Sequence, residues 1–289
     1  MAEIINGKLV SAKIRSEIAS EVTSFVATYG RRPGLAVILV GDDPASCVYV
    51  RNKHRACLET GIESFQIELP ESTTEDELLK KIDELNADSR VNGILVQLPL
   101  PKHISEQRVI ERISPIKDVD AFHPENVGRI MIGNYDMLPC TPAGVVELLR
   151  HYGIDPMGKR CAVIGRSNIV GKPMLHLLTE MNGTVTLCHS RTRELSEITS
   201  TADILVVAIG KPRFITADMV KPGAVVIDVG INRLTDGTLA GDVDFATVSE
   251  IASAITPVPG GVGPMTITML LRNTLTAAKK QADASAFNH

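Results

Sequence analysis

The sequence predicts an α/β protein with two parallel-sheet domains and an interdomain cleft. Two observations lead to this fold class. Short, continuous apolar runs alternate with segments of helical periodicity in two separate stretches of the chain, an order typical of parallel sheets joined by right-handed crossovers. The length of 289 residues also suggests two domains rather than one.

The first stretch predicts a domain over residues 1–140. Apolar residues recur at helical spacing from Ile14 to Phe25, so a helix is expected there. Thr74 and Glu77 have the spacing of a capping box, which predicts the start of a later helix. The other expected elements are a helix over 45–59, a strand over 64–69, and two apolar strands of the kind buried on both faces, over 35–40 and 93–98.

The second stretch predicts another parallel sheet over residues 141–265. Thr141 and Pro142 are expected as the N-cap and first residue of a helix to residue 151. A glycine-rich turn, Gly165–Gly171, separates the first strand of this stretch from a helix through Met181. The strands are expected over 160–164, 184–188, 203–209 and 224–229.

The last predicted helix, over 266–280, has no strand after it. We therefore expect the C-terminal segment 266–289 to pack back on the first domain, which would then be discontinuous. Residues 281–289 are mostly small and polar, and are expected to fray.

Composition excludes several classes of function. The net charge of −4 creates no field that would attract nucleic acid or an anionic membrane. No apolar run has the length of a membrane span, and the N-terminus lacks the features of a signal peptide. The five cysteines form no CxxC pair, which favours reduced thiols in a cytoplasmic protein over a disulfide framework or a metal site.

The turn Gly165–Gly171 has the position of a dinucleotide-binding turn, between a strand and a helix. Ser167 replaces the second glycine of the usual pattern, so an ordinary strand-to-helix turn stays an alternative. The next strand ends at Ser190 and Arg191 instead of an acid. With Arg166 these groups suit a 2′-phosphate, which predicts a Rossmann-like NADP-binding domain; a solvated surface charge is the alternative for Arg191.

A second candidate site lies in the first domain. Tyr49 and Lys53 are four residues apart on a predicted helix and share one face. A tyrosine ring can stack on a flat substrate, and a desolvated lysine suits acid/base work. Gln97 ends an apolar strand, where parallel sheets bind ligands. Asp118 and Asp120 follow in a loop. The alternative for Tyr49 and Lys53 is an ordinary amphipathic helix. The alternative for the two acids is a solvated surface loop.

A third feature is the segment Pro257–Thr266, which contains three prolines and three glycines just before the last helix. Proline fixes φ and glycine reaches positive φ, so the segment is a rigid loop whose backbone can approach a ligand closely. A simple turn is the alternative.

Taken together, these segments closely resemble the bifunctional methylenetetrahydrofolate dehydrogenase/cyclohydrolase family. The resemblance spans nearly the whole chain. The motifs that carry it are Ser46-x-x-Tyr49-Val50-x-x-Lys53, Gln97-Leu98-Pro99, Lys117-Asp118-Val119-Asp120, Pro139-Cys140-Thr141-Pro142, Gly165-Arg166-Ser167 with Val170-Gly171 and Pro173, His189-Ser190-Arg191-Thr192, Gly230-Ile231-Asn232 and the proline–glycine loop.

The resemblance implies that the enzyme oxidises 5,10-methylenetetrahydrofolate with NADP⁺ and then hydrolyses the product. It implies that Lys53 is the central acid/base residue of hydrolysis and that Gln97 orients it. Tyr49 would stack on the aminobenzoyl ring, Asp120 would hold the pterin, and Leu98 would line the substrate site. It further implies NADP contacts from Gly165, Arg166, Ser167, Ser190, Arg191 and Ile231, a substrate-bordering loop at Pro259, Gly260 and Gly261, and a homodimer.

One position departs from the family, which usually has glycine where this chain has Ala121. A methyl group there could crowd the pterin or change the loop, so folate affinity is the property in question. Two alternatives to the bifunctional enzyme follow: a monofunctional NADP-dependent methylenetetrahydrofolate dehydrogenase, and a nucleotide-sensing or scaffold protein with a spent active site.

Overall fold

The computed structural model describes residues 1–286, and of residues 285 and 286 it describes the backbone alone. The chain forms two compact units. We call Lys13–Cys140 with the C-terminal segment from Ile267 the first unit, and Met1–Ala12 with Thr141–Thr266 the second unit. The chain passes from one unit to the other three times: inside α1 (Gly7–Tyr29), at the start of α6 (Cys140–His151) and inside α10 (Val262–Ala286).

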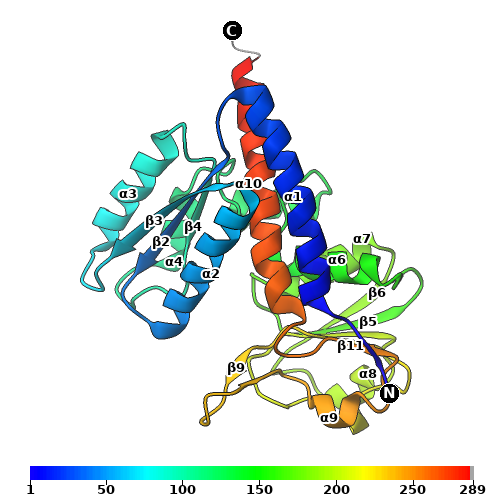
Figure 1. The fold of residues 1–289 in the computed structure, drawn as a ribbon. Coiled ribbons are helices and arrows are strands. Elements are labelled where there is room, and N and C mark those ends of the chain that lie inside the picture. The colour runs from blue at the N-terminus through cyan, green and yellow to red at the C-terminus, as the bar shows by residue number, and fades with distance from the viewer. Residues whose placement is uncertain (287–289) are drawn as a thin grey trace. The chain divides into compact units, whose positions relative to one another are not determined.

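The first unit is built on a three-stranded parallel sheet with the order β3-β2-β4 (Figure 1). The central strand pairs Ile38 with Ile67 on one side and with Val96 on the other. The elements of this unit besides the two long helices are β2 (Gly34–Val40), α2 (Pro44–Thr60), β3 (Glu63–Leu69), α3 (Glu75–Ala87), β4 (Gly93–Val96), α4 (Glu106–Arg112) and α5 (Pro124–Met131).

Burial explains the apolar run of β2. All seven of its residues are buried, as the sequence predicts. Ala36, Ile38 and Val40 face the core that α3 and α4 complete with Leu78 and Val109, among others. The predicted capping box of α3 is also confirmed: Thr74 accepts a hydrogen bond from the Glu77 amide, and the Glu77 carboxylate accepts one from the Thr74 amide.

Helices α1 and α10 run parallel, side by side (Figure 1, blue and orange to red). Arg15 Nε donates to Thr268 Oγ1 at 3.0 Å, and the Tyr29 hydroxyl donates to Asp283 at 2.7 Å. Gln281 Nε2 donates to the Asn92 carbonyl at 2.8 Å. The prediction of a frayed tail is therefore wrong up to residue 286, because α10 continues and is held there; residues 287–289 lie outside the described part.

The second unit contains a six-stranded parallel sheet with the order β1-β11-β8-β7-β5-β6. Its strands are β1 (Glu3–Ile4), β5 (Arg160–Ile164), β6 (Thr184–Cys188), β7 (Ile204–Val207), β8 (Val225–Asp228) and β11 (Ala254–Ile255). A hairpin of β9 (Asn232–Arg233) and β10 (Leu239–Ala240) is separate. The helices are α6 (Cys140–His151), α7 (Gly171–Glu180), α8 (Leu195–Thr199), the 3₁₀ helix η1 (Ala217–Met219) and α9 (Phe245–Val248).

Two details of the second unit differ from the sequence prediction. The first residues of the chain pack here and not with residues 13–140, because β1 pairs with β11 and aligns Glu3 with Ala254. Helix α6 begins at Cys140, so Thr141 lies inside the first turn and is no N-cap. Its hydroxyl instead shares a hydrogen bond of 3.0 Å with that of Thr266. Among the described residues, no helix combines the length and apolarity that a membrane crossing requires.

Candidate active site

The segment before Asp120 runs beside β4 and extends the sheet of the first unit. The Ile94 amide donates to the Lys117 carbonyl at 2.8 Å, and Ile94 bridges to Asp118 in parallel. A side chain at Gly93 would come within 2.5 Å of Val119, so only glycine allows this approach. Because the two segments are parallel, Asp120 and the residue after β4, Gln97, emerge at the same edge of the sheet.

Gln97 meets Lys53 of α2 at this edge. Lys53 Nζ donates to Gln97 Oε1 at 2.9 Å, and Gln97 Nε2 donates to the Leu98 carbonyl at 2.7 Å. The second bond fixes which end of the amide faces the lysine. The structure therefore brings together three of the predicted site residues, Lys53, Gln97 and Asp120, with Leu98 as the support of the amide.

The electrostatics of the pair suit proton transfer. Burial lowers the pKa of Lys53, and the negative charge of Asp120 partly opposes this shift. Desolvation likewise raises the pKa of Asp120, against the opposing charge of Lys53. A lysine whose pKa lies below its ordinary value exchanges protons more readily near neutral pH.

Asp118 supports the loop instead of facing a ligand. It is 3% exposed, and its Oδ2 accepts hydrogen bonds from the His123 amide at 2.8 Å and from Asn126 Nδ2 at 2.9 Å. Burial raises the pKa of Asp118 to about 6. Of the two acids in the predicted motif, Asp120 is thus the one available for substrate.

Cys140 is a member of this site whose role the sequence does not reveal. Cys140 is 2% exposed, its thiol donates to the Val119 carbonyl at 3.4 Å, and the charge of Asp120 acts on it. Burial and the charge of Asp120 raise the pKa of Cys140 well above the ordinary value. The position between Pro139 and Pro142 is the only sequence signal, and by composition the residue looks like any packed thiol.

Tyr49 and Ala121 are the remaining predicted features of the first unit. Tyr49 is 38% exposed, one helical turn before Lys53, so its ring can meet a ligand. Ala121 is fully buried and has φ of 56°, in the left-handed region that favours glycine. The departure at Ala121 therefore falls where an alanine strains the backbone, by about 1–2 kcal/mol.

In the second unit, the predicted dinucleotide turn follows β5. Gly165 has φ of 121°, and a side chain there would come within 2.2 Å of the Ala208 carbonyl. At Gly171 a side chain would come within 1.9 Å of the Gly165 carbonyl. Ser167 Oγ accepts hydrogen bonds from the amides of Val170 and Gly171 at 3.2 and 3.4 Å. Close packing thus leaves the turn's outer residues, including Arg166 and Ser167, exposed before the start of α7.

A second turn, after β6, holds Ser190 and Arg191. Thr192 closes this turn: its Oγ1 accepts from the His189 amide at 2.8 Å, and its amide donates to the His189 carbonyl at 2.9 Å. Ser190 and Arg191 are exposed, and residues 189–192, which follow the end of β6 beside Ile164, include no acid. These groups fit an NADP 2′-phosphate better than a bare ribose.

Ile231 follows β8 and is 44% exposed. The segments beside it converge on Asp242, a fully buried carboxylate that the sequence gives no reason to select. Asp242 Oδ2 accepts from the amides of Ile209 and Gly210 at 2.7 and 2.9 Å. Its Oδ1 accepts from the Lys211 amide at 2.9 Å and from Asn232 Nδ2 at 2.8 Å. One carboxylate thus ties together the chain after β7 and the chain after β8.

The proline–glycine loop also belongs to the second unit. Pro259 is exposed, whereas Gly260, with φ of 109°, and Gly261 are buried. The Lys8 amide donates to the Gly260 carbonyl at 3.2 Å, and a side chain at Gly7 would come within 1.8 Å of the Gly261 carbonyl. Close backbone packing explains the glycines. Pro259, Gly260 and Gly261 thus lie in the unit of the dinucleotide turn, and the Lys53 site lies in the other.

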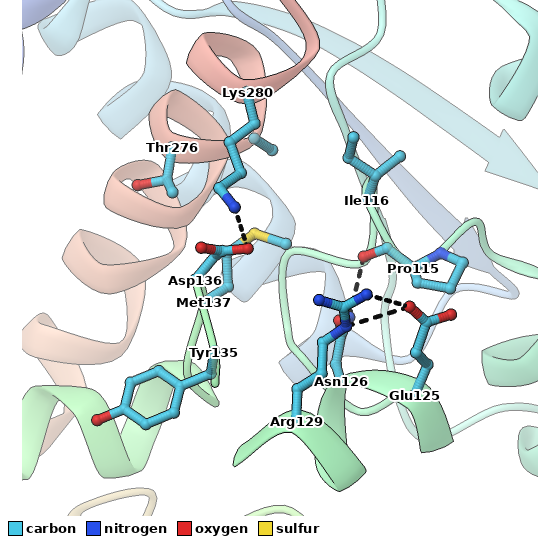
Figure 2. Close-up of a pocket in the computed structure, with 11 residues that line it drawn as sticks. Pro115, Ile116, Glu125, Asn126, Arg129, Tyr135, Asp136, Met137, Thr276 and Lys280 are labelled. Carbon is cyan, nitrogen blue, oxygen red and sulfur yellow. Dashed lines mark hydrogen bonds and ion pairs between the residues drawn. The ribbon is translucent and has the colours of Figure 1, made fainter. Parts of the chain in front are cut away.

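Figure 2 shows a separate pocket of about 210 Å³ in the first unit, between α5, α10 and the segments around Ile116 and Met137. None of the predicted site residues lines it. Its cations already have partners: Arg129 pairs with Glu125 at 2.8 Å, and Lys280 pairs with Asp136.

A lysine–amide–carboxylate site in one α/β unit and a glycine-rich dinucleotide turn in the other define the class of nucleotide-dependent α/β enzymes. Within this class, the tetrahydrofolate dehydrogenase/cyclohydrolase catalytic-domain model matches residues 5–120. The NAD(P)-binding-domain model of the same family matches residues 139–282. The chain therefore belongs to the tetrahydrofolate dehydrogenase/cyclohydrolase family.

Relatives match over nearly the full length. The chain is 62% identical to the "Bifunctional protein FolD" of Acetivibrio thermocellus, over 97% of this chain and 98% of that protein. Among solved structures, the bifunctional FolD of Campylobacter jejuni superposes with a TM-score of 0.95 at 51% identity, over 97% of this chain and 100% of that chain. The Trypanosoma brucei FolD, complexed with NADP cofactor and inhibitor, has a TM-score of 0.94 at 41% identity, over 97% and 98%.

A shikimate dehydrogenase from Aquifex aeolicus shares the fold at 14% identity, with a TM-score of 0.53 over 86% of this chain and 96% of that chain. The predicted α/β fold class with a Rossmann-like second unit is thereby confirmed, together with the family.

Proposed function

We propose that the protein oxidises 5,10-methylenetetrahydrofolate to the 5,10-methenyl form with NADP⁺ and hydrolyses that product to 10-formyltetrahydrofolate. The observation that carries the proposal is the Lys53–Gln97 hydrogen bond of 2.9 Å beside Asp120, in a chain that matches both domain models of the family. The folate site is assigned to the first unit and the NADP site to the second unit.

The oxidation needs binding and orientation more than acid/base chemistry. The methylene carbon lies between two nitrogens whose lone pairs favour the loss of hydride, and NADP⁺ accepts the hydride as a two-electron oxidant. Gly165, Arg166 and Ser167 would hold the pyrophosphate at the start of α7, and Ser190 with Arg191 would bind the 2′-phosphate. Ile231, exposed after β8, would pack against the bound dinucleotide.

The hydrolysis needs a proton carrier. Water adds to the cationic methenyl carbon, the bond from this carbon to N5 breaks, and one proton leaves, which yields the 10-formyl product. Lys53 would take and return protons at Nζ, with Gln97 fixing the position of that atom. Tyr49 would stack on the aminobenzoyl ring. Asp120 would accept hydrogen bonds from the pterin.

A monofunctional NADP-dependent dehydrogenase is the second candidate. A Bombyx mori structure described as a novel 5,10-methylenetetrahydrofolate dehydrogenase is 46% identical with a TM-score of 0.91, over 98% of this chain and 100% of that chain. The assembled Lys53–Gln97–Asp120 set favours the bifunctional enzyme. A cytoplasmic homodimer completes the proposal on the family resemblance, and light scattering tests the dimer.

One progress curve tests the proposal. The protein is mixed with 5,10-methylenetetrahydrofolate and NADP⁺, with NAD⁺ in a parallel sample, and NADPH and methenyl absorbance are recorded. Both activities predict NADPH formation with only transient methenyl product, and slower reaction with NAD⁺. Methenyl product that decays only at its spontaneous rate would leave a dehydrogenase. No reduction of either dinucleotide would reject the proposal in favour of a spent site.

A further inference from the structure

Asn273 of α10 joins the two segments that carry the buried side of the candidate active site. Its Nδ2 donates to the Val119 carbonyl and to the Leu138 carbonyl, both at 2.8 Å. The same nitrogen lies 3.7 Å from Cys140 Sγ. Asn273 is 6% exposed. One amide group from the last helix thus holds the residue before Asp120 and the residues that lead to Cys140.

The Val119 carbonyl accepts hydrogen bonds from two buried groups. Asn273 Nδ2 donates to it at 2.8 Å, and the Cys140 thiol donates to it at 3.4 Å. A carbonyl oxygen has two lone pairs and can accept both bonds. The charge of Asp120 also acts on the Cys140 thiol. Asn273 and Cys140 together therefore hold the residue that precedes Asp120.

We propose that Asn273 is a positioning residue, which acts through the Val119 backbone and the Cys140 thiol to hold the Asp120 carboxylate in place beside Lys53. The inference rests on the proposed function for its kinetic consequence, but its geometric part does not. Asn273 touches neither the reacting atoms nor the lysine, and no member of the predicted motifs includes it.

The competing interpretation is that Asn273 merely attaches α10 to the rest of the unit. Gln281 provides a matched control, because it does this eight residues later on the same helix. Its Nε2 donates to the Asn92 carbonyl at 2.8 Å and lies 3.4 Å from the Ile116 carbonyl. The Asn92 carbonyl precedes β4, and the Ile116 carbonyl lies four residues before Asp120, whereas Val119, which Asn273 contacts, directly precedes Asp120.

The experiment compares Asn273→Ala, the milder Asn273→Ser and the control Gln281→Ala in the full-length protein. We expect Asn273→Ala, which removes both carbonyl hydrogen bonds, to lower kcat/KM for methenyltetrahydrofolate hydrolysis about tenfold. Asn273→Ser keeps a donor and should lose less. The pH profile of kcat/KM should also shift, because a displaced Asp120 interacts differently with the titratable groups around it. The groups that face one another there are Asp120, Lys53, Cys140, Asp118 and Cys57. Gln281→Ala should leave the profile unchanged.

Alkylation of Cys140 by iodoacetamide, followed by mass spectrometry, supplies a readout that needs no activity. With Asn273 removed, the segment loosens and Cys140 should be alkylated faster than in the wild type and in Gln281→Ala. If the wild type proves inactive, the proposed function fails, and this rate still tests the positioning. The inference is overturned if Asn273→Ala and Gln281→Ala give the same pH profile and the same alkylation rate, or if alkylation accelerates while the kinetics stay those of the wild type.

Discussion

Asp242→Asn is the substitution whose consequences the structure defines most sharply. The wild-type carboxylate is fully buried and accepts four hydrogen bonds, two on each oxygen, from three backbone amides and Asn232. A carboxylate suits this task because both of its oxygens are acceptors. The asparagine side chain has one acceptor oxygen and one NH₂ group. In either orientation of the amide, the NH₂ group therefore faces two of the four donors.

The magnitude follows from this count. A buried donor left without an acceptor costs about 1–3 kcal/mol, so two of them should lower the free energy of unfolding by about 2–6 kcal/mol. This is a large part of the 5–15 kcal/mol typical of a folded domain. The chain after β7 and the chain before Asn232, which includes Ile231, would lose their common anchor. Oxidation with NADP⁺ should therefore become slower, whereas the Lys53 site belongs to the other unit and should keep its activity.

Urea unfolding measures the first effect, and the ratio of oxidation to hydrolysis measures the second. Asp244→Asn is the control, because within the described part of the chain the Asp244 carboxylate accepts a single hydrogen bond, from the Thr247 hydroxyl at 2.8 Å. We expect a loss of less than about 1 kcal/mol there. The reasoning is refuted if the two variants unfold at the same urea concentration, or if Asp242→Asn lowers hydrolysis as much as oxidation.

Three further predictions concern other parts of the structure. Gly171→Ala places a methyl group 1.9 Å from the Gly165 carbonyl and should weaken NADP⁺ binding in equilibrium dialysis, whereas Gly128→Ala, with open space around it, should not. Lys53→Gln should abolish hydrolysis but only reduce oxidation; equal losses would contradict the role of its Nζ. Asp118, whose pKa burial raises from 3.8 to about 6, binds its proton more tightly in the folded state. Its contribution to the free energy of unfolding should therefore fall by up to about 3 kcal/mol as the pH rises from 4 to 6, and Asp118→Asn should remove that part of the slope in urea titrations, while the similarly shifted Asp228 keeps its own part.

Local patterns in the sequence predict much of the fold because strands such as β2, β4 and β7 are buried at every residue and are therefore continuously apolar. The run around Ile38 can be recognised by its apolarity alone, and the Thr74 capping box by its spacing. The two-residue strands β1 and β11 cannot be predicted in this way, because two residues show no periodicity. Their pairing nevertheless determines which unit contains the first residues of the chain.

The same difference applies to the candidate site. Tyr49, Lys53 and Gln97 can be proposed from the sequence, since a helical spacing and a strand end place them. Cys140 and Asn273 cannot, because nothing local reveals that their segments meet Val119. These contacts depend on the return of the last helix to the first unit, which is a property of the tertiary fold.

The chemistry of the two supporting residues explains why each is of its type. Asn273 must hold carbonyl oxygens beside a carboxylate, so it has to be a donor without charge. A lysine or arginine in its place would attract Asp120 and compete with Lys53 for it. Asp242 must hold N–H groups, so it has to be an acceptor, and its negative charge strengthens each bond. At each position the polarity of the backbone groups that are held, and not the volume of the side chain, determines which residue type is suitable. Exchanging the two residue types would therefore damage both sites, even though asparagine and aspartate have nearly the same shape.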